Sequence, residues 1–112
     1  MPGSGYDTDL RTALVATVVA VKASGGRLYG IDVSNPNAAV AFIQVFDLAA
    51  ADITLGTTVP KLSLMVPVSN ADCHFVWPMG ISFGIAIRIA ATTTFGGSTA
   101  PTTGLVVNTI FL

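Results

Sequence analysis

The sequence has very few charged residues and contains no glutamate. Only 10% of its 112 residues are charged, whereas an average soluble domain has about 25%. Every acidic residue is an aspartate, and Gln44 is the single glutamine, so two strong helix-forming residue types are almost absent. A chain with so few solubilising groups exposes apolar area, so we expect other subunits to cover part of its surface. The alternative is a small monomer whose surface consists of Thr, Ser, Asn and Gly.

Basic clusters, long apolar runs and paired cysteines are also missing, which argues against several protein classes. The five basic residues are scattered, so no basic stripe could neutralise nucleic-acid phosphates. The longest apolar run, residues 13–21, is much shorter than the ~20 residues of a membrane helix. A single cysteine excludes an internal disulfide framework. The N-terminus has no secretion-signal pattern, so we expect synthesis in a cytoplasm.

The residues that are abundant predict an all-β domain. Val, Ile and Thr occur in short runs separated by Gly, Pro, Asn and Asp, which is typical of strands joined by turns. Seven or eight antiparallel strands of this length usually form two packed sheets, a β-sandwich. We expect an extended N-terminal arm over residues 1–9 and one sandwich domain over residues 10–112. The predicted strands cover residues 13–21, 27–33, 39–46, 61–68, 73–77, 80–91 and 105–112.

Two of these strands are apolar on both faces. In residues 39–47 and in residues 13–21, both sets of alternating positions are largely apolar. In a two-layer sandwich only one face of each sheet meets the core, so the second face needs another partner. Subunit association is the simplest candidate. Pro67 has no N–H group, which places the strand over residues 61–68 at a sheet edge.

The stretch GISFGIAIRIAATTT predicts a strand with two different faces. One face is heavily apolar and should lie in the core; its members are Ile81, Phe83, Ile85, Ile87 and Ile89. On the other face, Ser82, Gly84 and Ala86 are small, so another subunit or layer could approach closely. The alternative is that Gly84 only marks a bulge.

The residues suited to catalysis or metal binding are not arranged for either. Cys73 and His74, the only thiol and the only imidazole, are neighbours in a predicted strand and therefore point to opposite faces. Asp7 and Asp9 alone lack the remaining oxygens of a calcium loop. We therefore expect no catalytic residue, no metal site and no cofactor.

Aromatic residues offer the remaining binding chemistry. A carbohydrate could stack on exposed rings, for which the candidates are Tyr6, Tyr29, Phe75, Trp77 and Phe95. The segment CHFVWPMG is either a core strand or an edge that packs on a neighbouring subunit. Together with the small-residue face, the predicted interface consists of Tyr6, Phe75, Trp77, Ser82, Gly84 and Ala86.

Four segments in order resemble a group of small virion proteins of tailed bacteriophages. They are YGIDVSNPNAAVAFIQVFDL, LGTTVPKLSLMVP, GISFGIAIRIAATTT and TTGLVVNTIFL, and they cover most of the chain from Tyr29 onward. The resemblance implies a β-sandwich, often jelly-roll-like, that serves as a structural part of the particle.

The expected function is that of a capsid decoration (cement) protein in the virion, made in the cytoplasm of the bacterial host. We expect it to form a homo-oligomer, a trimer, and to bind the major capsid protein without catalysis. The alternative is a tail or fibre module that contacts host surface glycans.

Overall fold

Eight β-strands and one turn of 3-10 helix make up the structure. The computed structural model describes residues 5–112, except for the side chains of residues 70 and 71. The elements are β1 (Asp7–Leu14), β2 (Val19–Lys22), β3 (Gly26–Asn35), β4 (Ala41–Phe46), η1 (Ala50–Asp52), β5 (Leu62–Val66), β6 (Asn70–Phe83), β7 (Ile87–Thr92) and β8 (Leu105–Phe111). Within the described residues, no helix is long and apolar enough to cross a membrane.

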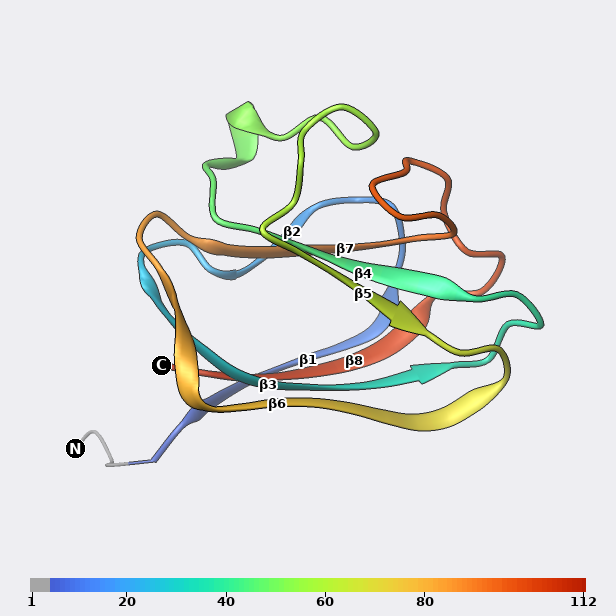
Figure 1. Cartoon of the computed structure of the whole chain (residues 1–112), viewed down its shortest axis with the longest axis horizontal. Coiled ribbons are helices and arrows are strands. Elements are labelled where there is room, and N and C mark those ends of the chain that lie inside the picture. The colour runs from blue at the N-terminus through green and yellow to red at the C-terminus, as the bar shows by residue number, and fades with distance from the viewer. Residues whose placement is uncertain (1–4) are drawn as a thin grey trace.

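The strands form two antiparallel sheets that pack face to face, which confirms the predicted all-β sandwich (Figure 1). Sheet A has the order β1-β8-β3-β6, and sheet B has the order β2-β7-β4-β5. Strand β5 lies at the edge of sheet B, as Pro67 predicted. Alternating apolar residues from both sheets fill the space between them; among them are Leu28, Ile31, Ile43, Ile89 and Val107, all fully buried.

Loops of the same chain cover the centre of the outer face of sheet B, while Met65 on the edge strand β5 stays 54% exposed. Phe46 and Gln44 alternate with the core residues of β4, yet both are at most 1% exposed. Figure 1 shows the segments β4–β5 and β7–β8 lying over this sheet. Gln44 donates a hydrogen bond to the Thr94 carbonyl (3.2 Å), and Phe42 contacts the Phe95 ring at 6.5 Å between centroids. The second face of β4 is therefore buried by the chain itself. The expectation that this face requires another subunit is wrong.

The SNPN turn holds three segments together at one end of the sandwich. Asn35 is almost fully buried, and its amide nitrogen donates to the carbonyls of Ala39 and Pro67, both at 3.0 Å. Its amide oxygen accepts from the backbone and side chain of Asn37. Asn37 in turn exchanges two hydrogen bonds with the Thr103 backbone. The turn motif thus joins the β3–β4 corner to the end of β5 and to the β7–β8 loop.

The N-terminal boundary differs from the prediction. Strand β1 begins at Asp7, which pairs with Phe111 of β8, so residues 7–9 belong to the sandwich and not to an arm. An aspartate is tolerated here because β1 is an edge strand, and Asp9 forms an ion pair with Arg11 (2.9 Å). Residues 1–4 of the predicted arm lie outside the described residues. The predicted strand 13–21 is also divided, because the chain leaves sheet A after Leu14 and enters sheet B at Val19.

The predicted strand 80–91 is interrupted by a turn. The turn exchanges the expected burial of Ile85 and Ala86. Gly84, Ile85 and Ala86 donate their backbone N–H groups to the carboxylate of Asp47, at 2.9, 2.7 and 3.2 Å. Burial acts to raise the pKa of Asp47, but these hydrogen bonds and the charge of Lys61 outweigh it and lower the pKa. As a result Ile85 is 52% exposed and Ala86 is fully buried. Ile85 is therefore not a core residue, and Ala86 cannot contact another subunit.

Introducing lysine at these two neighbouring positions should have opposite effects on stability. In Ala86→Lys, the long side chain enters a closed space, so we expect a loss of at least ~2 kcal/mol in the free energy of unfolding. In Ile85→Lys, the side chain reaches water, so the change should stay within about 0.5 kcal/mol. Denaturant unfolding of the two purified variants measures both values. Equal destabilisation would contradict the turn described here.

Candidate functional site

The outer face of sheet A has no loop over it among residues 5–112, which the structure describes (Figure 1). We call it the open face. Two rows of residues cross it from β1 to β6: Thr8, Ile110, Gly30 and Val76, and then Leu10, Asn108, Asp32 and His74. Leu10 and Val76 are 63% and 69% exposed, and Val106 of β8 adds to the exposed apolar area. The open face is thus a mixed surface, on which exposed aliphatic side chains such as Leu10 and Val76 lie beside polar residues and one polar cluster.

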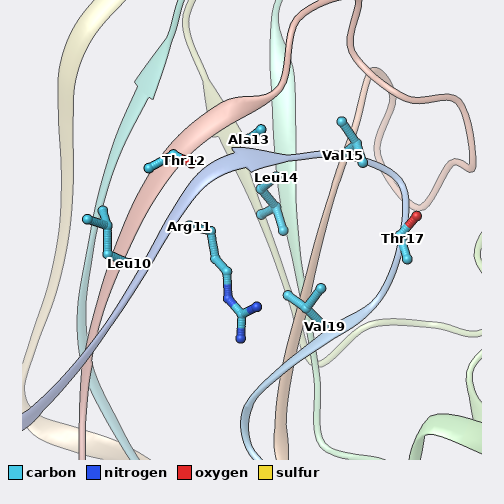
Figure 2. Close-up of a pocket in the computed structure, with 8 residues that line it drawn as sticks. All are labelled: Leu10, Arg11, Thr12, Ala13, Leu14, Val15, Thr17 and Val19. Carbon is cyan, nitrogen blue, oxygen red and sulfur yellow. The ribbon is translucent and has the colours of Figure 1, made fainter.

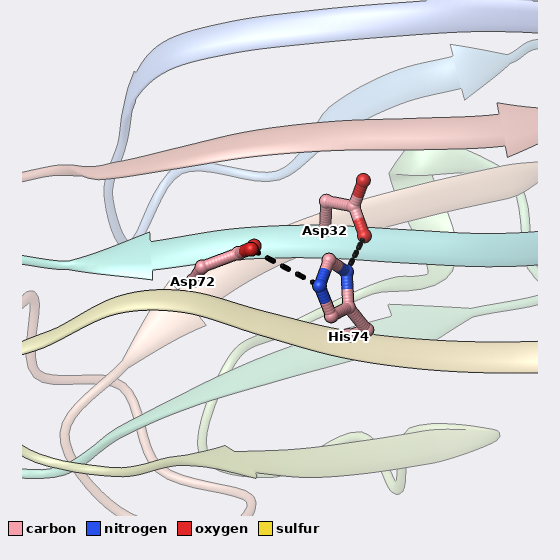
Figure 3. Close-up of side chains that lie close together, drawn as sticks. All are labelled: Asp32, Asp72 and His74. Atoms are coloured by element: carbon pink, nitrogen blue, oxygen red, sulfur yellow. Dashed lines mark hydrogen bonds and ion pairs between the residues drawn. The ribbon is translucent and has the colours of Figure 1, made fainter.

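The polar cluster consists of Asp32, Asp72 and His74 (Figure 3). Asp32 on β3 and His74 on β6 are direct cross-strand partners, and Asp72 precedes His74 by two residues on β6. The His74 ring lies between the carboxylates: Nδ1 contacts Asp32 Oδ1, and Nε2 lies 3.0 Å from Asp72 Oδ2. The hydrogen bond with Asp32, together with the charge of Asp72, raises the pKa of His74.

A divalent cation could use the same three groups, since their ligand atoms lie within 4.8 Å of one another. The observed arrangement instead places one ring nitrogen against each carboxylate. A protonated imidazole is a donor at both nitrogens and fits this geometry directly. The cluster can therefore hold an imidazolium between two carboxylates, on a solvent-exposed part of the open face.

A groove lined by aromatic residues lies beside this cluster. Its volume is about 280 Å³. We call it the aromatic groove; its lining residues are Tyr6, Tyr29, Gly30, Asp32, Phe75, Val76, Trp77, Pro78 and Ile110. The Tyr6 and Tyr29 rings contact each other, with centroids 4.7 Å apart. Asp32 belongs to both the groove and the polar cluster, so the two features form one continuous site.

An irregularity in β6 forms one wall of the groove. Between the pairs Gly30–Val76 and Leu28–Ile81, β6 has four residues where β3 has only Tyr29. Gly80 adopts a φ of 76°, which a side-chain-bearing residue rarely does. Arg27 holds the extra residues by donating to the Met79 carbonyl (3.1 Å). The bulge therefore widens the edge of sheet A next to Tyr29.

Another hollow, of about 350 Å³, lies where the chain passes from β1 to β2 (Figure 2). Arg11 extends from β1 there and donates to the Ala20 carbonyl (2.8 Å) and to Asp9. Most of the other lining residues are aliphatic or threonine. Because the one charged group is engaged by its own chain, this hollow offers no group directed at a ligand.

The structure brings together only part of the predicted interface. Tyr6, Phe75 and Trp77 all line the aromatic groove, although Phe75 and Trp77 also pack against the core. Ser82 and Gly84 are exposed at the far end of β6 and in the turn that follows, and neither lines the groove. The prediction that Ala86 belongs to the interface is wrong, because Ala86 is fully buried.

The remaining residues singled out from the sequence lie apart from the site or have structural partners. Phe95 covers sheet B and does not reach the groove, unlike the other four candidate aromatics. Cys73 packs against the core, and its burial raises the pKa of the thiol. Sequence reasoning missed the Asp32–His74 pair, because the pair depends on the register between β3 and β6. The alternation of polar and apolar residues in these two strands is a signal that could have placed both side chains away from the core.

Removing the Asp32 carboxylate should lower the pKa of His74. We expect an NMR titration to place this pKa above the ordinary 6.5, and to find it lower in Asp32→Asn and, to a smaller extent, in Asp72→Asn. Because the folded-state pKa is raised, the contact stabilises the fold below the unfolded-state pKa, and this effect disappears as the pH rises through the folded-state value. Asp52→Asn serves as the control and should leave the titration unchanged. A wild-type pKa at or below 6.5 would contradict the geometry.

No protein-family model, curated protein or solved structure gives a significant match to this chain.

Proposed function

We propose that the protein is a structural component of a bacteriophage virion, a capsid decoration protein that binds and stabilises the assembled head. The observation that carries the proposal is the open face, a four-stranded surface with exposed aliphatic side chains (Leu10, Val76, Val106), whereas loops bury the centre of the corresponding face of sheet B. Such a surface in a chain with few charges favours contact with another protein. The resemblance to small phage virion proteins supplies the kind of partner.

The order of the strands supports the same proposal. Each sheet holds four strands, and successive strands alternate between the sheets except for β4 and β5. We interpret this order as a jelly roll of two Greek keys, an architecture that recurs in viral capsid and lectin domains. The fold is compatible with a role in a particle but does not by itself select one.

Stabilisation of the head would follow from mass action. A protein that binds assembled capsid subunits, and not the dissociated ones, shifts the equilibrium toward the shell. A contact of ordinary size, roughly 1,200–2,000 Å² in total, is sufficient for specific binding. In this proposal, a homotrimer places the open face of each subunit against the major capsid protein or against its neighbour.

The proposal assigns no catalytic role to the chain. The Cys73 thiol packs toward the core, while the His74 imidazole lies on the open face. A nucleophile and its base must be within hydrogen-bond reach, which these two groups on opposite faces of β6 are not. The proposed role therefore relies on non-covalent binding.

A second candidate is a tail or fibre module that contacts host surface glycans. The observation in its favour is that four aromatic residues, Tyr6, Tyr29, Phe75 and Trp77, line one groove together with Asp32. Aromatic rings can pack on the apolar face of a sugar, while a carboxylate accepts hydrogen bonds from hydroxyl groups.

Placing a carboxylate on the open face should weaken binding to heads that lack this protein. Val76→Asp buries an unpaired charge in the proposed contact, so we expect at least a tenfold loss of affinity without loss of the fold. Val59→Asp is the matched control, because Val59 is 83% exposed in the β4–β5 loop, which covers sheet B. Co-sedimentation with purified heads measures binding, and light scattering measures the oligomeric state. Equal binding by the two variants would refute the decoration proposal, and retention by host glycans that Tyr6→Ala abolishes would favour the second candidate.

A further inference from the structure

The aromatic groove contains a carboxylate as well as aromatic rings, and the two carboxylates of the neighbouring cluster outnumber its one imidazole. Among its nine lining residues, Asp32 is the only charged one, and none is basic. Asp72 adds a second carboxylate nearby, with the His74 ring between the two. Figure 3 shows the second oxygen of Asp32 directed away from that ring. A ligand complementary to this groove therefore carries a positive charge on a partly apolar body.

The tyrosines of the groove are held in place before any ligand binds. The Tyr29 ring packs so closely on Gly80 that a Cβ added there would lie 2.9 Å from Tyr29 Cε1. Tyr6 packs on Tyr29 and remains 59% exposed. Gly30 adds no side chain to the groove, where a Cβ would lie 3.3 Å from the Phe75 carbonyl oxygen. The groove thus presents an accessible, supported ring next to a carboxylate.

We propose that the aromatic groove binds an arginine side chain of the partner protein. The guanidinium lies against the Tyr6–Tyr29 pair and donates to Asp32, while the methylene groups contact Ile110 and Val76. Arginine fits better than lysine because its planar group stacks on aromatic rings, is weakly hydrated and matches the two oxygens of a carboxylate.

A sugar fits the same lining less well. A glycan presents several hydroxyl groups that need hydrogen-bond partners once they are buried. The side chains of the nine lining residues offer only the Asp32 carboxylate, two phenol hydroxyls and the Trp77 indole N–H. The inference deepens the decoration proposal by naming the chemistry of the partner, and it depends on that proposal only for the partner's identity.

The experiment is an NMR titration of the full-length protein with N-acetyl-L-arginine amide. The matched probe is N-acetyl-L-citrulline amide, which has nearly the same shape but no charge. We expect saturable shifts at residues of the groove with the arginine probe, at concentrations up to about 50 mM. The citrulline probe should cause no saturable shift.

Three variants locate the site. Asp32→Asn should weaken binding of the arginine probe about tenfold, because a charge-assisted hydrogen bond is lost. Tyr6→Ala should weaken it about threefold through the lost cation–π contact. Asp52→Asn removes an exposed carboxylate from η1 and should bind as the wild type does.

Several results would overturn the inference. They are equal binding of the two probes, shifts outside the groove, unchanged affinity in Asp32→Asn, or saturable binding of a monosaccharide in place of the arginine probe. None of these bears on whether the protein binds heads, so a failure here is distinguishable from a failure of the decoration proposal. Loss of head binding in Asp32→Asn, with head binding retained in Asp52→Asn, would connect the two.

Discussion

Two packed sheets have four faces, and the main constraint on this structure is which of these faces are shielded from water. The inner faces cover each other, as in any sandwich. The centre of the outer face of sheet B is covered by the β4–β5 and β7–β8 segments (Figure 1), and Phe46 and Gln44 are buried in that sheet. Among residues 5–112, no loop covers the outer face of sheet A in this way. The asymmetry between these two outer faces selects the open face, with its aromatic groove and its Asp32–His74 pair, as the candidate site.

This constraint also changes what the composition implies. Few charges and many apolar residues predicted an extensive subunit contact. Much of that apolar excess is used inside the chain, where long loops bury the second face of β4. The apolar side chains that stay exposed on the open face, such as Leu10 and Val76, form a smaller surface. The low charge is therefore explained in part by the loops that cover sheet B, and the contact proposed above is left to sheet A.

The fold was largely predictable because alternation and turn residues are local signals. The strands near β3, β4, β5 and β8 were placed to within a few residues, and Pro67 predicted an edge strand. Alternation predicted the wrong burial for Ile85 and Ala86. The apolar alternation of the sequence continues through a short turn there, whose backbone amides donate to Asp47, a residue distant in sequence.

The site was less predictable because it depends on contacts between distant segments. Three aromatic residues of the groove were expected to be at an interface, but nothing local indicated that they meet. The pair Asp32 and His74 depends on cross-strand register, and the space beside Tyr29 depends on a bulge in β6. Both features are set by tertiary pairing, which a period-two pattern does not encode.

The bulge in β6 has a consequence for contacts between copies of the protein at high concentration. Strand β6 is long and forms an edge of sheet A, so its unpaired backbone groups could add a strand from a neighbour and start a fibril. Pro78 removes one donor from that edge, and the extra residues around it break the regular spacing that a foreign strand would need. Pro67 follows the last residue of the edge strand β5 in sheet B. With so little charge to keep molecules apart, the interrupted β6 edge and the β5 edge that ends at Pro67 both oppose fibril growth.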